Sequence, residues 1–239
     1  MGRTVMGVAV RQVPLLDVPV VELVGPAGAG KSTVMSFLRD QQAKDEQSGT
    51  ASDRTHGRTA RLAIRSASDW LPAAIAVMLK SPLLGKEVVR HMIRVRTMQD
   101  DLPRLRRCAG TALLFDEGPV LSLARISRVC EMAGSEMLRE YRAAYLSAWS
   151  ESLSMVVYLD AVDPVLASRI NGRKKRHAIK GLDDAQVRSF LAWYRRHYAE
   201  ILDYLAGRGV RVVHIDTSAE SAGDVAERVA AIVGALHVR

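Results

Sequence analysis

Eight consecutive residues near the start of the sequence have the types and spacing needed to hold phosphate groups. Gly25 and Gly30 are separated by four positions, and Lys31 and Ser32 follow directly. Glycines let the backbone wrap closely around an anion, so that successive N–H groups point inward. In this pattern the lysine reaches the β- and γ-phosphates and the serine hydroxyl ligates magnesium. The sequence therefore predicts a phosphate-binding loop, or P-loop, for a nucleoside triphosphate.

This loop lies between two elements that suit the role. Residues 18–24 are mostly apolar and predict a short buried strand, and residues 32–40 predict the helix that the loop opens. A helix N-terminus adds its partial positive charge to a phosphate site. A chance glycine-rich turn would lack both neighbours. We predict that the nucleotide is held by these residues: Gly25, Ala27, Gly28, Ala29, Gly30, Lys31, Ser32 and Thr33.

A second acidic site follows another apolar stretch. Residues 111–115 predict a strand that ends at Asp116 and Glu117. P-loop enzymes hold magnesium with the P-loop hydroxyl and an acidic group on another strand. We therefore predict that Ser32 and Asp116 are the metal ligands and that Glu117 polarises a hydroxyl or a water. The simpler alternative is a solvated strand end, because carboxylates often occur there.

A basic segment between Arg169 and Gly181 is a candidate lid. It includes four consecutive cationic residues, at positions 173–176, and has glycines at both ends that can act as hinges. A mobile cationic clamp stabilises the charge that spreads over a transferring phosphoryl group. Arg169 and Arg173 are the candidate catalytic residues because they lie nearest the preceding helix. The alternatives are a solvated basic loop and a nucleic-acid patch.

The rest of the chain predicts an α/β fold. Continuous apolar strands alternate with amphipathic helices, a pattern typical of a parallel sheet covered on both faces. Asp183 and Gln186 predict a capping box at the start of a long helix that Gly207 ends, and Asp163 is predicted as the N-cap of another helix. Further strands are predicted over residues 153–159 and 210–215, with a weaker one over 59–65, and further helices over 69–107, 135–150 and the last residues of the chain.

We expect a single domain spanning residues 1–239. Its core would comprise residues 18–40, 110–170 and 182–239, with a helical substrate-binding region over about 66–108 and the lid over about 169–181. The sequence contains no internal repeat and no linker that would divide it.

Composition restricts the partners and the compartment. The net charge of +8 favours anionic partners, which include nucleic acid and phosphorylated small molecules. Cys108 and Cys130 predict reduced thiols rather than a disulfide framework. There is no uncharged apolar stretch of about 18 residues and no signal-peptide pattern, so we expect a cytoplasmic protein that does not span a membrane. A homodimer is possible.

Taken in order, these elements resemble the P-loop kinases of nucleosides and nucleotides, the thymidylate kinase-like and deoxynucleoside kinase-like group. The resemblance includes the run Tyr158 to Pro164 and covers most of the chain. It implies a three-layer fold around a five-stranded parallel sheet, a helical substrate region, a basic lid and ATP with Mg²⁺ as the phosphoryl donor. It also implies that adenine lies near residues 217–220.

One departure from this family bears on the acceptor. Thymidylate kinases typically have Asp-Arg where this sequence has Asp116-Glu117. A carboxylate there would repel a phosphorylated acceptor and would suit a neutral hydroxyl that must lose its proton. Asp69 is a looser candidate for the same role. Arg90 and Arg94, one helical turn apart, could bind an acidic acceptor or could simply line a solvated helix face.

The leading hypothesis is an ATP-dependent kinase that phosphorylates a hydroxyl of a small acceptor, either nucleoside-like or another metabolite. The alternatives are a P-loop ATPase in which Glu117 activates water and a nucleoside monophosphate kinase. The sequence has no Leu-Ser-Gly-Gly-Gln signature of transporter ATPases and no Asn-Lys-x-Asp motif of GTPases. A nucleic-acid-binding module is disfavoured because its basic runs lack interleaved aromatics.

Overall fold

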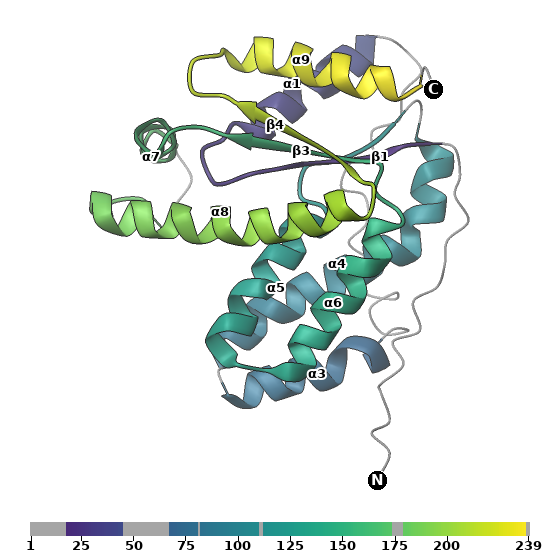
Figure 1. Ribbon diagram of the computed structural model, residues 1–239, viewed down its shortest axis with the longest axis vertical. Coiled ribbons are helices and arrows are strands. Elements are labelled where there is room, and N and C mark those ends of the chain that lie inside the picture. The colour runs from purple at the N-terminus through teal and green to yellow at the C-terminus, as the bar shows by residue number, and fades with distance from the viewer. Residues whose placement is uncertain (1–17, 45–66, 81, 110–111, 174–178, 238–239) are drawn as a thin grey trace.

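The computed structural model describes residues 18–44, 67–80, 82–109, 112–173 and 179–237. Their elements form a parallel sheet with helices on both faces (Figure 1). The weak strand predicted over residues 59–65 and the middle of the predicted lid, residues 174–178, lie outside these ranges.

The sheet is parallel throughout, as the sequence predicted. Its strands lie in the order β2-β1-β3-β4, so β1 pairs with β2 on one side and with β3 on the other. Four strands are present in the described part of the chain, where the family resemblance implied five. Their bounds are β1 Val20–Val24, β2 Leu113–Phe115, β3 Met155–Asp160 and β4 Arg211–Asp216.

One face of the sheet is covered by two helices from opposite ends of the chain. Helix α1 (Lys31–Lys44) and helix α9 (Ala222–Gly234) pack side by side above the strands in Figure 1. Val21 and Leu23 point toward them and belong to the same buried cluster as Val34 and Val229. A short 3₁₀ turn, η1 (Ala235–His237), follows α9.

The opposite face supports a larger helical layer. Alternate residues of β1, Val20 and Val24, point into a second buried cluster that contains Trp149 and Leu123. Helix α8 runs along this face, and the other helices extend away from the sheet as a bundle (Figure 1). The helices of this layer are α3 Ala67–Lys80, α4 Pro82–Cys108, α5 Pro119–Ala133, α6 Glu136–Ser150 and α8 Asp184–Gly207.

The helix ends agree with the sequence signals in part. The capping box of Asp183 and Gln186 is present at the start of α8, as predicted. Helix α7 (Asp163–Asn171) begins differently, because Val162 is its N-cap and the predicted N-cap Asp163 is already in its first turn. The Asp163 carboxylate instead binds Arg195.

Sequence analysis did not identify α5, although its limits carry recognisable signals. Pro119 occupies the first turn, where its missing N–H costs nothing, and Gly134 ends the helix in the left-handed conformation. The helix is amphipathic, because its buried residues fill one side and Arg125, Arg128 and Glu131 lie on the other, less buried side.

Of the helices in the part of the chain that the structure describes, none combines the length and apolar character that a membrane span requires.

The larger core cluster gives a direct test of the packing. Trp149 is fully buried and meets Phe115 edge-on, with ring centroids 6.3 Å apart. We expect Trp149→Ala to lower the free energy of unfolding by about 3–5 kcal/mol. The matched control Leu79→Ala, on a side chain that is 82% exposed, should change it by less than about 0.5 kcal/mol. Urea denaturation measures both, and similar values for the two variants would contradict the assignment of this core.

Candidate active site

The P-loop follows β1 and turns sharply where the strand ends. Gly25 has a φ of 144°, and a Cβ at this position would lie 1.9 Å from the carbonyl oxygen of Leu159 on β3. Only glycine fits a backbone this close to its neighbour. The loop then leads into α1, where the Thr33 and Val34 N–H groups donate to Gly30 O. The predicted strand–loop–helix arrangement is therefore present.

Lys31 lies at the centre of the charged groups of this site. Its Nζ donates to the carbonyl oxygens of Gly25, at 2.7 Å, and Pro26, at 2.9 Å. Burial lowers its pKa to about 8, while the negative charges of Asp116 and Glu117 act in the opposite direction. The predicted phosphate lysine and the predicted acidic pair are thus brought together by the fold.

Asp116 and Glu117 follow β2 at the same edge of the sheet. Burial raises the pKa of Asp116, and the positive charge of Lys31 opposes that rise. Glu117 accepts a hydrogen bond from Arg94 Nη1 at 3.1 Å. The sequence assigned Glu117 to hydroxyl activation and Arg94 to an acidic acceptor, and the structure places the two in one ion pair.

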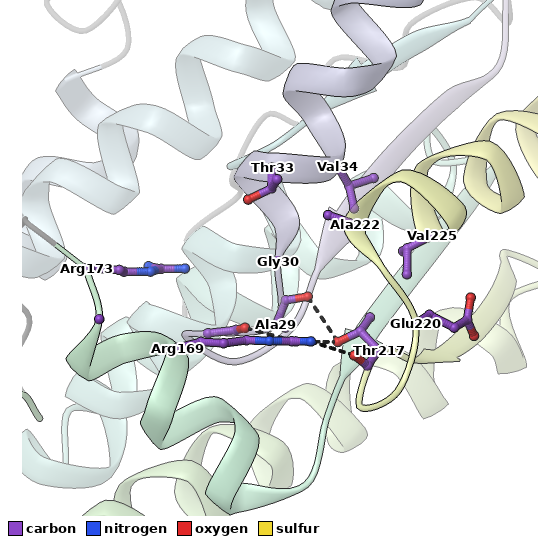
Figure 2. Close-up of a pocket in the computed structure, with 12 residues that line it drawn as sticks. Ala29, Gly30, Thr33, Val34, Arg169, Arg173, Thr217, Glu220, Ala222 and Val225 are labelled. Carbon is purple, nitrogen blue, oxygen red and sulfur yellow. Dashed lines mark hydrogen bonds between the residues drawn. The ribbon is translucent and has the colours of Figure 1, made fainter.

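A cavity of about 500 Å³ lies beside the P-loop, between it and the loop after β4 (Figure 2). Arg169 donates to Thr217 Oγ1 at 2.9 Å and to Thr217 O at 2.7 Å. Thr217 Oγ1 in turn lies 3.4 Å from Ala29 O of the P-loop. The cavity is lined by Gly28, Ala29, Gly30, Thr33, Val34, Arg169, Gly172, Arg173, Thr217, Glu220, Ala222 and Val225.

The two arginines of the predicted lid differ in position. Arg169 is fixed on Thr217 at one end of the cavity (Figure 2). Arg173 also lines the cavity but is exposed, and its positive charge acts on Lys31. Arg169 lies on helix α7, and Arg195 holds the segment that leads into this helix. Arg195 donates to both carboxylate oxygens of Asp160, at 2.7 and 3.1 Å, and to the carbonyl oxygen of Ala161, at 2.8 Å.

A group of cationic side chains surrounds His91 on α4. The His91 Nδ1 lies 3.4 Å from Ser122 Oγ of α5. Burial, together with the positive charges of Arg125, Arg94 and Arg90, lowers the pKa of His91 to about 4. The positive charge of Arg125 on α5 also acts on Lys31 and lowers its pKa.

Asp69, the alternative base, lies on α3, and its side chain is outside the described residues. The residues Arg125, His91, Arg195 and Glu22 were missed by sequence reasoning. Arg125 and His91 carry no motif. Glu22 did carry a signal, because it is the single charged residue within the apolar stretch 18–24.

The candidate metal ligands are the Ser32 hydroxyl and the Asp116 carboxyl group. Within the described ranges, no three His, Cys, Asp or Glu side chains cluster as a metal site. This suits Mg²⁺, which proteins usually hold through one or two side chains together with water and substrate phosphates. Ser32 opens α1 and Asp116 ends β2, and the effect of Lys31 on Asp116 places the two segments close together. The pair fits the predicted metal.

Comparison with known proteins gave one informative relative in sequence. The chain is 27% identical over 187 residues to an adenylate kinase from Stenotrophomonas maltophilia, and the alignment covers 78% of this chain and 85% of the relative. No family model matches the chain.

Two solved structures are similar in fold. Deoxyadenosine kinase from M. mycoides, with the products dCMP and a flexible dCDP bound, has a TM-score of 0.52 at 12% identity, covering 90% of this chain and 99% of that one. Shikimate kinase from Acinetobacter baumannii, in complex with shikimate, has a TM-score of 0.48 at 17% identity, covering 93% and 96%. The second score is too low to support a conclusion.

The sequence relative and the shared fold confirm the resemblance that the motifs indicated. The chain is similar to P-loop kinases of the nucleoside and nucleotide kinase-like group in sequence and in fold, and these findings support an ATP-dependent small-molecule kinase.

The His91 environment predicts a pH dependence of stability. The imidazole takes up a proton near pH 6.5 when unfolded but only near pH 4 when folded. The unfolded state therefore binds more protons between these values, and stability falls as the pH drops through this window. We expect His91→Gln to make that fall shallower in urea denaturation at pH 7.0, 5.5 and 4.5. Parallel pH profiles for the variant and the wild type would contradict the assigned burial.

Proposed function

We propose that the protein transfers the γ-phosphoryl group of ATP to a hydroxyl of a small acceptor that also carries an anionic group. The observation that supports this most directly is the set of three arginines, Arg90 and Arg94 on α4 and Arg125 on α5, two helices that pack together. The positive charges of all three act on His91, and that of Arg125 also acts on Lys31. The described elements would act as one catalytic domain, with α3 and α4 as the acceptor-binding region and residues 169–181 as the lid.

On the donor side, the P-loop amides and Lys31 would hold the phosphates. The purine would lie in the cavity between the loop and residues 217–225. Arg169 is anchored on Thr217 there, which suits a role at the base end of the nucleotide. Arg173, nearer Lys31, would neutralise charge on the transferring phosphoryl group.

Ser32 and Asp116 would hold Mg²⁺, which neutralises phosphate charge when bound. Asp116 suits the role because its carboxylate lies beside Lys31 at the carboxyl edge of the sheet. Fixed donors at this position would orient the triphosphate without rearranging during the reaction.

On the acceptor side, Glu117 would take the proton of the attacking hydroxyl. It is 59% exposed and is held by Arg94. An ion pair of this kind orients the carboxylate while leaving one oxygen, Oε1, free of that bond. Asp69 remains the second proposed base.

The proposal of an anionic acceptor depends on the positive charges of Arg94 and Arg125. The sequence argument for a neutral acceptor depended on an unpaired Glu117 carboxylate, and Arg94 lies 3.1 Å from it. Arg125 adds a further cation, with its guanidinium 4.9 Å above the Tyr194 ring and its Nη1 3.8 Å from Glu87 Oε1. The arginine guanidinium group binds carboxylates and phosphates alike through two parallel N–H···O hydrogen bonds. The name of the sequence relative, adenylate kinase, refers to an anionic acceptor whose own phosphate is the accepting group, which is the nucleoside monophosphate kinase alternative.

A panel of paired acceptors tests this function. ADP release would be measured with no acceptor, with nucleosides and with the matching 5′-monophosphates, and with sugars and the matching hydroxy acids or sugar phosphates. We expect turnover only with acceptors that carry a negative charge, and a product whose new phosphate is on the hydroxyl. A nucleoside diphosphate formed from a monophosphate would instead support the nucleoside monophosphate kinase. Turnover without an acceptor would support an ATPase that activates water through Glu117, and a preference for the neutral member of each pair would contradict the anionic site.

Two variants, Arg125→Gln and Arg211→Gln, test which arginine binds the anionic group of the acceptor. We expect Arg125→Gln to raise the KM of the anionic acceptor by about 10- to 100-fold, the loss expected for a hydrogen bond to a charged group. The KM for ATP should change by less than about threefold. Arg211→Gln, on the exposed first residue of β4, is the matched control and should leave both constants unchanged. Equal effects of the two variants would contradict the assignment.

A further inference from the structure

A carboxylate lies inside the sheet, on the strand that leads into the P-loop. Glu22 is in the middle of β1, is fully buried and points to the same face as Val20 and Val24. Removing a carboxylate from water is costly unless the group is hydrogen-bonded. Burial raises the pKa of Glu22 to about 8, and backbone hydrogen bonds from Leu121, Val120 and Gly118 oppose the rise.

These backbone partners are the N-terminus of α5. Glu22 Oε2 accepts from the N–H of Val120 at 2.8 Å, and Oε1 accepts from the N–H of Leu121 at 3.0 Å. The first N–H groups of a helix have no partner within it. The N-cap residue Gly118 offers no side chain, so a glutamate almost 100 residues earlier in the chain supplies the cap.

The same carboxylate limits what can occupy position 118. A Cβ on Gly118 would lie 2.5 Å from the Glu22 carboxyl carbon and 2.7 and 2.9 Å from its oxygens. The φ of Gly118 is −89°, which other residues adopt readily, so the close approach to Glu22 alone requires glycine here.

The contact is adjacent to the proposed metal ligand. Glu22 is the register partner of Phe115 in the β1–β2 pair, and Asp116 and Glu117 fill the short connection from Phe115 to Gly118. That connection is therefore fixed at both ends to β1, by strand pairing at Phe115 and by the Glu22 carboxylate at α5. Three residues after Glu22, β1 becomes the P-loop.

We propose that Glu22 is a positioning residue for phosphoryl transfer: its carboxyl group ties the start of α5 to the P-loop strand and thereby sets Asp116 at the correct distance from Ser32. This rests on the proposed function, in which Asp116 and Ser32 hold Mg²⁺. Glu22 is fully buried, so the proposed role acts through Asp116 and not through contact with substrate.

ATP binding with and without Mg²⁺ tests this role without any acceptor. Isothermal titration would give the Kd of ATP in EDTA and in Mg²⁺, and their ratio is the factor by which the metal tightens binding. In Glu22→Gln an amide NH₂ replaces one acceptor oxygen and faces a backbone N–H. We expect this ratio to fall by about tenfold, as for other groups that orient a metal ligand. The Kd in EDTA should stay within about twofold of the wild-type value.

Two further variants separate positioning from general stability. Val20→Ala removes buried volume from the same face of the same strand, farther from the loop, and should leave the ratio unchanged. Gly118→Ala keeps Glu22 but displaces its contact, so it should lower the ratio as Glu22→Gln does. If Glu22→Gln does not fold, the ratio of ATP Kd values in EDTA and in Mg²⁺ measured for Gly118→Ala tests the proposal.

The proposal would be overturned if a folded Glu22→Gln or Gly118→Ala variant kept the wild-type ratio of ATP Kd values in EDTA and in Mg²⁺. It would also be overturned if Val20→Ala lowered this ratio equally, or if the wild-type protein bound ATP equally with and without Mg²⁺. The acceptor panel is a separate measurement. Failure of the kinase function would therefore appear as absent acceptor-dependent turnover, and failure of the positioning role as an unchanged binding ratio.

Discussion

The parallel pairing of β1 with both β2 and β3 is the constraint on which the whole site depends. Parallel strands end at the same edge of a sheet, and ligands of open α/β sheets bind outside that edge. The P-loop follows β1, Asp116 follows β2 and Thr217 follows β4, although these residues are far apart in the sequence. The close contact of Gly25 with Leu159 then determines where the loop turns.

At this edge of the sheet, burial disfavours the charged forms of Lys31 and Asp116, and the attraction between their opposite charges favours them. Lys31 loses part of its preference for the charged state through burial and regains some from Asp116 and Glu117. Arg195 secures the end of β3 and the start of α7 by binding two carboxylates and a carbonyl, and so fixes the helix that carries Arg169. Such arrangements of fixed charges cost little to reorganise when a phosphoryl group moves.

Local sequence patterns were sufficient for the features that depend on local chemistry. The P-loop, the strand that ends at Asp116 and the capping box of α8 are each specified by a few neighbouring residues. What could not be predicted depends on packing between distant segments. Arg125 gains its place in the site from the packing of α5 against α4, Glu22 meets its partners about 100 residues away, and Asp163 binds Arg195 instead of capping its own helix.

The central claim is that the γ-phosphoryl group leaves ATP for an organic hydroxyl and not for water. The most direct measurement follows that group. The protein would be incubated with ATP labelled in the γ-phosphoryl group, in ¹⁸O-water, with a pool of small hydroxylated anions. This account predicts that the label appears in an organic phosphate whose bridging oxygen comes from the acceptor. Release of the label as inorganic phosphate containing solvent ¹⁸O, at the same rate with and without the pool, would contradict it.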